Sequence, residues 1–318
     1  MYYNGNMRWA KSFTVAAVAV KLALPAYGAS ALWILPPTGW LDWGLRWLGT
    51  MALILWCGLG CAWHDVGWIW RKPWLSLCAV AGTLSITKLP ARPVTGGVSA
   101  DAILWALLGL WFGRMALAAW RGRRCPNGAV DLAFPLRHGT YVVVQGGSTK
   151  AVNYHHPHPL QTYALDVVKV NRWGVRCRGF LPAPLERYFI FGDPVYSPCA
   201  GQVVQAEGNA EDTPLPHSDP VQPAGNHLVI RADGVRVWLA HLKRGSLRVQ
   251  VGDWVEPGQL VGEVGHTGNS TEPHLHVHAE VYRDDLQRHV GVPVRFDGEF
   301  LVRNAVVHRA PCDASIFF

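Results

Sequence analysis

The sequence contains no CxxC pair, and its seven cysteines form no recognisable framework. A redox site or a structural zinc site of the CxxC type is therefore excluded. Nucleic-acid-binding motifs are absent too, although the formal net charge is +7. Much of this charge flanks apolar segments, where lysine and arginine usually mark membrane topology. We therefore expect no nucleic-acid partner. The positive net charge says little about the substrate.

The cysteines do not decide the cellular compartment. Cys125, Cys177, Cys199 and Cys312 lie in the C-terminal part of the chain. They allow up to two disulfides if that part faces an oxidising compartment, where disulfides persist.

Charged residues are scarce, at 16% of the chain, whereas hydrophobic residues make up 50%. Long apolar runs lie between residues 12 and 120, and residues 129–318 are punctuated by glycine and proline. We therefore expect an α-helical transmembrane region of three or four helices at residues 1–124, followed by a separate domain at residues 129–318.

The N-terminal region offers several candidate spans, and a span takes about 20 apolar residues. Ser12–Leu35, Leu45–Trp63 and Ala102–Trp120 are long enough. Trp74–Ile86 is shorter and is more typical of a re-entrant or interfacial piece. Tryptophans crowd the segment edges, as in an interfacial belt. Two alternatives are buried helices of a soluble domain and a cleavable signal peptide at residues 8–29.

The charge pattern leaves the topology open. With four spans and the N-terminus inside, the positive-inside rule places Arg121, Arg123 and Arg124 in the cytoplasm, together with the C-terminal domain. With three spans and residues 64–100 kept on the cytoplasmic side, the C-terminal domain emerges outside.

The C-terminal part shows the pattern of a mainly antiparallel β domain. Short alternating segments occur at Thr140–Val144, Gln202–Gln205, Leu228–Arg231 and Val235–Leu239, separated by glycine, proline, aspartate and asparagine. In Val251–Gly265, turn residues recur between small apolar groups, which indicates tight hairpins in a compact sandwich.

The residues that suggest chemistry are histidines and one aspartate. His274 and His276 share one face of an extended strand, about 7 Å apart, and can address one metal and its water from the same side. His241 ends another apolar strand, and Asp166 interrupts a strand-like run. A catalytic zinc takes three protein ligands of this kind and keeps one position open. It lowers the pKa of bound water towards 7 and polarises a carbonyl.

Together these segments resemble the lysostaphin-like (LytM-type) zinc metalloendopeptidases. The matching pieces, in the family's order, are Tyr163–Asp166, Gly192–Gly201, Leu239–Leu242, Gly252–Gly265 and Gly265–His276. The resemblance implies a lysostaphin-like fold and a bound Zn²⁺ with Asp166 and His276 as ligands. It also implies that His241 and His274 are unligated histidines that orient the water and stabilise the oxyanion.

The first zinc ligand departs from the usual pattern of the family. That ligand is a histidine four residues before the aspartate, where this chain has Thr162. The chain is similar to a branch in which an Asn-x-His element precedes the aspartate through a longer loop. On that comparison His155 is the expected ligand, and His156 and His158 are the alternatives. His278 stands where the family commonly has an acidic residue, and we interpret it either as an ordinary strand residue or as one that supports a ligand.

The resemblance implies a membrane-anchored endopeptidase that cleaves peptidoglycan stem or bridge peptides. This function favours the plasma or inner membrane, with the peptidase domain on the extracytoplasmic side. One alternative is an inactive module that binds or activates a cell-wall partner, which Thr162 favours. Another is a biotinyl- or lipoyl-type carrier domain, which the hairpins of Gly252–Gly265 suggest. That segment lacks the required lysine.

Overall fold

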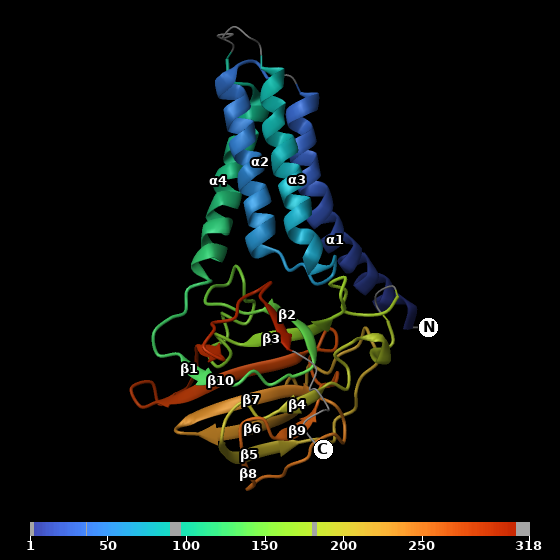
Figure 1. Ribbon diagram of the computed structural model, residues 1–318, viewed down its shortest axis with the longest axis vertical. Helices are drawn as coiled ribbons and strands as arrows, with labels where there is room; N and C mark the ends of the chain where they lie inside the picture. Colours follow the sequence, from blue (N-terminus) through green and yellow to red (C-terminus); the bar gives the residue numbers. More distant parts are fainter. Residues whose placement is uncertain (1–2, 36, 90–96, 180–182, 310–318) are drawn as a thin grey trace, which may run out of the picture.

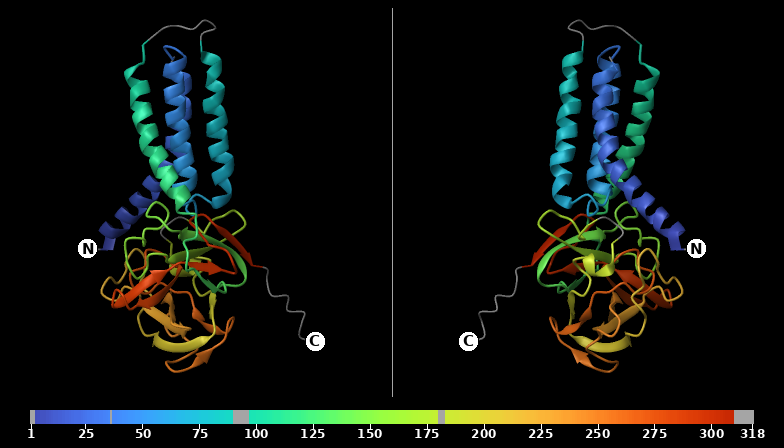
Figure 2. Two further views of the ribbon diagram at one scale, coloured as in Figure 1. Left: turned by 90° about the vertical axis from the view of Figure 1, so that its left-hand side faces the viewer. Right: turned by 90° about the vertical axis from the view of Figure 1, so that its right-hand side faces the viewer.

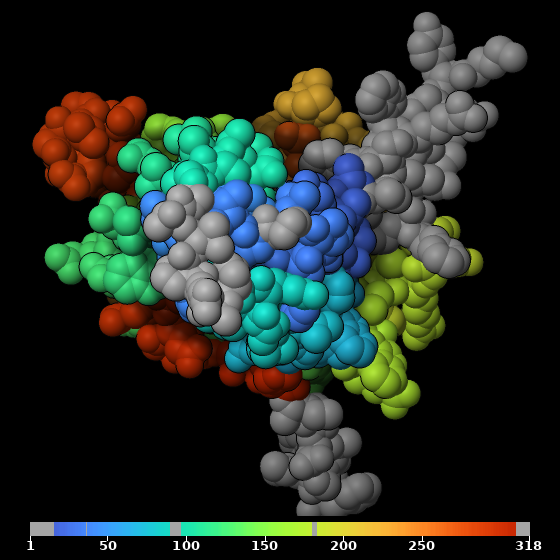
Figure 3. Space-filling view, turned by 90° about the horizontal axis from the view of Figure 1, so that it is seen from above, coloured from blue at the N-terminus to red at the C-terminus, as the bar shows by residue number. Residues whose placement is uncertain are grey.

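The computed structural model describes residues 3–35, 37–89, 97–179 and 183–309. A bundle of long helices stands on a β domain, and the two follow each other in the sequence (Figure 1). Viewed from the far end of the bundle, the helices occupy the middle of the molecule and the wider β domain extends beyond them (Figure 3).

Helices α1 to α4 form the bundle. Their bounds are α1 Tyr3–Ile34, α2 Trp40–Gly60, α3 Arg71–Leu84 and α4 Ala100–Arg121, with short 3-10 helices at Trp68–Trp70 and Ser85–Lys88. The helices run side by side, with α2 packed most extensively against α4 and α1 against α3 (Figure 2). The start of α1, the connection from α2 to α3 and the end of α4 all lie beside the β domain. The beginning of the chain and the β domain therefore lie at the same end of the bundle.

Among the described residues, two ion pairs are buried in the bundle. Lys21 Nζ lies 2.6 Å from Asp65 Oδ1, and both side chains are 8% exposed. Arg46 pairs with Asp42 at 3.0 Å and donates to the Ser99 hydroxyl at 2.9 Å. Lys21, the charge within the first expected span, is thus compensated by a carboxylate.

Two helical segments, Ala16–Ile34 and Ala100–Arg121, are long and apolar enough to cross a membrane. The expected span at Leu45–Trp63 corresponds largely to α2, which falls short of that hydropathy because Arg46 and several tryptophans interrupt its apolar residues. The short segment at Trp74–Ile86 lies in α3 and its 3-10 extension, and packs along the bundle.

The β domain contains a large, mainly antiparallel sheet. Its strands lie in the order β13-β2-β3-β10-β7-β6-β5-β8, with β11 paired to β10. The strand bounds are β1 Val130–Leu132, β2 Gly139–Gln145, β3 Leu165–Val170, β4 Pro194–Tyr196, β5 Gly201–Glu207, β6 Asn226–Ala232, β7 Val235–Leu242, β8 Trp254–Val255, β9 Leu260–Glu263, β10 Leu275–Arg283, β11 Arg288–Val292, β12 Val294–Phe296 and β13 Val306–Arg309. Two small sheets pair β1 with β12 and β4 with β9. The expected fold class, a mainly antiparallel β domain after N-terminal helices, is confirmed.

Strand alternation separates the core of the β domain from the polar face. Leu275, Val277 and Ala279 of β10 are at most 1% exposed and belong to the hydrophobic core. His276 and His278 point to the opposite face, because successive side chains of a strand alternate. The central strands therefore present polar side chains on one face of the sheet and pack against the hydrophobic core with the other.

The connection from α2 to α3 is fastened to the β domain. The Trp63 backbone N–H donates to Asn304 Oδ1 at 3.0 Å, and Asn304 Nδ2 donates to the Cys61 carbonyl at 2.8 Å. Arg303 donates from one side chain to the Gly60 carbonyl and to the Val144 carbonyl of β2. These contacts join the helical bundle directly to the β domain, next to the central strands of its sheet.

The described cysteines of the C-terminal part, Cys125, Cys177 and Cys199, are free thiols. Cys312 lies outside the described residues. The disulfides that the cysteine count allows are therefore not formed among the described cysteines.

Candidate metal centre

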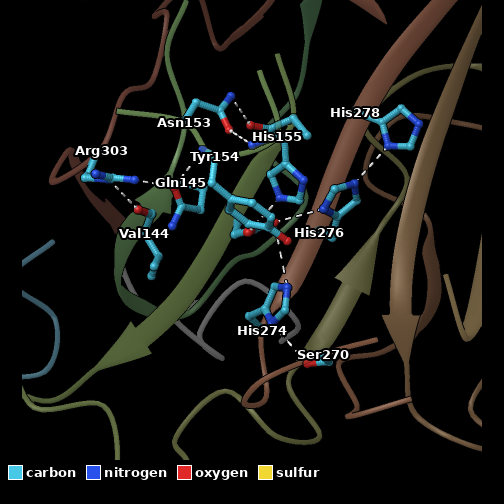
Figure 4. Close-up of polar contacts among 12 residues, drawn as sticks. Val144, Gln145, Asn153, Tyr154, His155, Ser270, His274, His276, His278 and Arg303 are labelled. Carbon is cyan, nitrogen blue, oxygen red and sulfur yellow. Dashed lines mark hydrogen bonds and ion pairs between the residues drawn. The ribbon is translucent and has the colours of Figure 1, made fainter. Parts of the chain in front are cut away.

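His155, Asp166 and His276 converge at the centre of the sheet. Strands β3 and β10 are neighbours, and their register sets Asp166 opposite His276. Asp166 Oδ1 lies 2.9 Å from His276 Nδ1, and Asp166 Oδ2 lies 2.9 Å from His155 Nε2. The three ligand atoms lie within 4.8 Å of one another, and all three residues are buried. In Figure 4 the rings of His155 and His276 turn toward each other.

His155 reaches this place from a loop that Asn153 holds. Asn153 is fully buried and donates through Nδ2 to the carbonyls of Gly147 and Ala164, at 3.2 and 3.0 Å. Its Oδ1 accepts from the His155 backbone N–H at 3.1 Å. The Tyr154 ring lies against the His155 ring, with 4.1 Å between centroids. The asparagine of the Asn-x-His element thus fixes the loop, and the histidine faces Asp166.

Two further histidines adjoin this cluster without belonging to it. His274 Nδ1 donates to the Glu272 carbonyl at 2.7 Å, and its Nε2 lies 3.7 Å from Asp166 Oδ1. His241 Nδ1 donates to the Thr267 carbonyl at 2.8 Å. The two rings are 4.7 Å apart. Because a carbonyl can only accept, each Nδ1 carries a proton, and Nε2 is the nitrogen of each ring that is left to face the cluster.

The backbone of His241 is held in an unusual conformation. Its φ of +63° lies in the left-handed region, which residues other than glycine rarely adopt. Such conformations persist when the surrounding structure enforces them, and they gather at functional sites. Here the conformation turns the ring toward His274 at the end of β7.

His278 contacts the far side of His276. Its Nδ1 lies 2.9 Å from His276 Nε2, and its ring stacks on Trp238 with an interplanar angle of 12°. The Trp238 indole N–H donates to the Glu280 carboxylate. His276 Nδ1 faces Asp166 and its Nε2 faces His278 Nδ1, so the ring is held in place through both of its nitrogens.

Electrostatics distinguish the carboxylate from the imidazoles. Burial raises the pKa of Asp166, but the neighbouring His155, His274 and His276 outweigh it and hold that pKa well below its usual range. Burial, reinforced by His274 and His276, places the pKa of His241 well below its usual range. Asp166 is therefore an anion, and His241 is a neutral imidazole, at neutral pH.

Two cavities flank the cluster. One, of about 260 Å³, is lined by Tyr154, Trp238, His241 and Glu280 among others. The other, of about 270 Å³, is lined by Asp166 and His274 among others and shares Tyr154 and Asn269 with the first.

Other histidines near the site are not part of the cluster. His156 and His158 follow His155 in the loop but are not part of the described three-residue cluster. His227 stacks on Trp238 from β6 at 5.2 Å. His266 is fully buried and contacts the Ser270 hydroxyl at 3.0 Å, behind His274.

One group near the site was missed by the sequence analysis. Glu272, whose carbonyl holds His274, accepts from Arg176 Nε at 2.6 Å and lies 3.3 Å from His64 Nε2. Burial raises the pKa of Glu272, but Arg176 outweighs it and lowers that pKa below its usual range. Burial lowers the pKa of His64, and the positive charge of Arg176 lowers it further, so His64 is a neutral donor. The loop after α2 therefore supports the segment that carries His274.

The buried imidazole of His266 predicts a loss of stability in mild acid. Burial lowers its pKa from 6.5 to about 4. Between these two values the unfolded state binds more protons, so the free energy of unfolding falls as the pH falls. The share of His266 is about 2 kcal/mol at pH 5 relative to pH 7.5. Thermal unfolding of the full chain at both pH values should show a smaller drop in Tm for His266→Gln. An unchanged drop would show that this imidazole does not contribute.

A family model described as peptidase family M23 matches residues 189–288. Lysostaphin from Staphylococcus staphylolyticus is 50% identical over 54 residues, which are 16% of this chain and 11% of that protein. Glycyl-glycine endopeptidase ALE-1 from Staphylococcus capitis is 48% identical over 54 residues, which are 16% and 14% of the two chains. The family match covers the segment that supplies His241, His274 and His276. Residues 189–288 are thus similar to peptidase family M23, of the lysostaphin-like type, and the C-terminal domain that contains them is called the M23 domain below.

The M23 domain also has similar solved structures. The catalytic domain of lysostaphin from Staphylococcus simulans is 25% identical and covers 38% of this chain and 71% of that one, with a TM-score of 0.26. A zinc-containing peptidase from Vibrio cholerae is 23% identical and covers 50% and 37%, with a TM-score of 0.30. The matched segments of the curated relatives span 11% to 14% of those proteins. His155 and Asp166 precede the matched residues of the M23 domain.

Proposed function

We propose that the M23 domain is a zinc metalloendopeptidase that hydrolyses peptide bonds in peptidoglycan cross-links or stem peptides. The observation that carries the proposal is the convergence of five side chains. His155, Asp166 and His276 present ligand atoms within 4.8 Å of one another, and His241 and His274 adjoin them. The relatives include a glycyl-glycine endopeptidase, which supports a peptide substrate.

The donor set fits Zn²⁺. Two imidazole nitrogens and one carboxylate oxygen are a common three-ligand set for catalytic zinc. His155 would bind through Nε2 and His276 through Nδ1, the atoms that already face Asp166. His276 keeps its second nitrogen for His278, which is how ligating histidines are usually oriented. Bound Zn²⁺ would supply Lewis-acid polarisation of the scissile carbonyl and acidify water.

The unligated histidines perform the proton transfers. His241 and His274 each have Nδ1–H fixed on a carbonyl, which leaves Nε2 to accept a proton from the attacking water. Once protonated, the same nitrogen can hydrogen-bond to the developing oxyanion and pass the proton to the leaving amine. The low pKa of His241 keeps its imidazole in the accepting form before reaction.

The two cavities suggest where the substrate lies. A peptide that occupies both would place residues on either side of the scissile bond, with Tyr154 between them. Trp238 and Leu160 give the first cavity an apolar wall, and Glu280 lies at its edge. An amino group of a cross-linking peptide would be attracted to that carboxylate.

An inactive binding module is the alternative. It was favoured by Thr162, the residue that replaces the usual first ligand. Thr162 instead donates its hydroxyl to the His158 carbonyl at 3.0 Å, and His155 fills the vacant ligand position from the preceding loop. The donor set is therefore complete without Thr162, which supports the enzyme over the binding module.

The helical region at residues 1–124 is proposed to anchor the peptidase domain at residues 129–318 in the plasma or inner membrane. Its outward-facing residues are large and apolar, including Leu48, Leu55 and Leu107, each more than half exposed. Such surface is unfavourable in water and suits lipid. A soluble bundle would be expected to cover these faces with polar residues.

The proposed substrate requires the peptidase domain on the extracytoplasmic side. The bundle then places the start of α1 on that side as well. Arg121, Arg123 and Arg124 at the same end favour the opposite orientation by the positive-inside rule. Labelling of a cysteine introduced at exposed Lys150, in intact cells with an impermeant maleimide, decides between the two. Labelling supports the proposal, and protection until lysis contradicts it.

The peptidase proposal is tested on purified peptidoglycan. The full chain in neutral detergent should release soluble muropeptides whose masses correspond to peptide-bond cleavage, with a new free amino group for each cut. Sugar-chain cleavage products, or no release by a folded and zinc-loaded protein, would contradict the proposal.

A further inference from the structure

The bundle has a groove between α2 and α3, at the end that adjoins the β domain. Its volume is about 600 Å³. The walls come from both helices and are largely apolar, and three of the lining residues are cationic. The lining residues are Ile54, Leu55, Gly58, Leu59, Arg71, Lys72, Leu75, Ser76, Ala79 and Arg123.

The cations of this groove have no counter-charge within the part of the chain that the structure describes. Among the described residues, the side chains of Arg71, Lys72 and Arg123 take part in no hydrogen bond or ion pair. Arg71 Nη1 and Arg123 Nε are shielded from solvent and have no acceptor. By contrast, the buried Arg46 and Arg176 have carboxylate partners. Shielded N–H donors without an acceptor are energetically unfavourable, so the groove lacks an anionic partner for these side chains.

The arrangement of charge and apolar surface matches one class of molecule. Arginine donors in a planar fork match the oxygens of a phosphate. The start of α3 at Arg71 has no side-chain cap, and its helix dipole favours an anion there. Beyond the cations, Ile54, Leu59 and Leu75 offer a surface for a hydrocarbon chain. Exposed Trp70, beside Arg71, is typical of the interfacial level where lipid headgroups lie.

We propose that the groove between α2 and α3 is a binding site for an anionic phospholipid. The phosphate lies among Arg71, Lys72 and Arg123, and one acyl chain lies along α2 and α3. The site depends on the proposed membrane insertion and is independent of the peptidase activity. Since the loop from α2 to α3 also contacts the β domain through Trp63, a lipid here would be bound close to the junction of the two domains.

Native mass spectrometry of the full chain in neutral detergent tests the site. The probes are phosphatidylglycerol, phosphatidylcholine and inorganic phosphate. Phosphatidylglycerol should bind at least about tenfold more tightly than phosphatidylcholine. Equal affinity for the two lipids would overturn the proposal. Inorganic phosphate that competes at the same concentration as phosphatidylglycerol would indicate a free-anion site and would overturn it too.

Matched variants locate the binding. Arg71→Gln with Arg123→Gln should lose the preference for phosphatidylglycerol, whereas Arg121→Gln with Arg124→Gln should keep it, although both remove two charges from the same end of the bundle. Retained preference in the first variant, or equal loss in the control, would contradict the proposal. The first variant should also have a Tm at least as high as the unaltered chain in phosphatidylcholine, because it removes unpaired charges.

A further variant tests the binding of the acyl chain separately from the binding of the headgroup. Ser76 is exposed on the groove wall, so Ser76→Phe fills the space without removing a charge. Weaker binding of phosphatidylglycerol with unchanged binding of inorganic phosphate supports an acyl chain in the groove. Unchanged lipid binding would overturn this assignment. Because the position is exposed, the variant does not depend on repacking of the core.

Discussion

Replacing His276 with alanine is expected to abolish zinc retention and peptide hydrolysis together. His276 Nδ1 and His155 Nε2 contact the two oxygens of Asp166, so removal of His276 leaves two ligands. Three protein ligands are the usual minimum for catalytic zinc. We expect zinc content to fall from about one per chain to a small fraction, with hydrolysis reduced by about 10⁴-fold or more. Atomic absorption and muropeptide release measure the two effects on the same preparation.

His158→Ala is the matched control for this variant. His158 is exposed in the loop after His155 and lies outside the described metal-ligand cluster. The control should keep both zinc and activity. Full activity of His276→Ala would refute the proposed centre. Loss of zinc in the control would show that a histidine next to His155, and not His155 itself, is the first ligand.

His241→Asn is expected to give the second largest loss, with zinc retained. Asparagine is chosen because it tolerates the left-handed conformation of residue 241, which alanine would adopt only with strain. The substitution removes Nε2 as the proton acceptor, which lowers kcat by about 10²–10⁴-fold. The His241 side chain is not part of the ligand triad, so zinc content should stay near one per chain.

His227→Asn serves as the comparison for His241→Asn, because it removes a ring from the neighbouring strand β6 without touching the pair formed by His241 and His274. Its kcat should change less than about threefold. The proton-transfer role is refuted if His241→Asn loses zinc, or if its kcat equals that of the His227 variant.

Alternation and turn residues were sufficient to predict the β domain. Each of the four expected strands lies inside an observed one, as Val235–Leu239 lies inside β7, which continues to Leu242. Alternating apolar and polar residues indicate which side chains of a strand are buried. This pattern is interrupted where polar site residues such as His241 lie near the end of the strand. The sequence therefore placed the strands but underestimated their lengths near the site.

The grouping of the three candidate metal ligands could be predicted from the sequence because its members lie in short motifs. Asp166 and His276 meet through strand register, and His155 was expected from the Asn-x-His element. The contacts among Glu272, Arg176 and His64 could not be predicted from the sequence. Arg176 and Glu272 are 96 residues apart, and their pairing depends on how the α2–α3 loop packs on the β domain. Contacts of this kind carry no local periodic signal.

The direct test of the proposed centre is the zinc content of the purified full chain, measured before and after dialysis against a chelator. The account predicts about one zinc per chain, removed by the chelator and restored by added Zn²⁺, with muropeptide release lost and recovered in parallel. A folded chain that neither retains nor takes up zinc would contradict the centre formed by His155, Asp166 and His276.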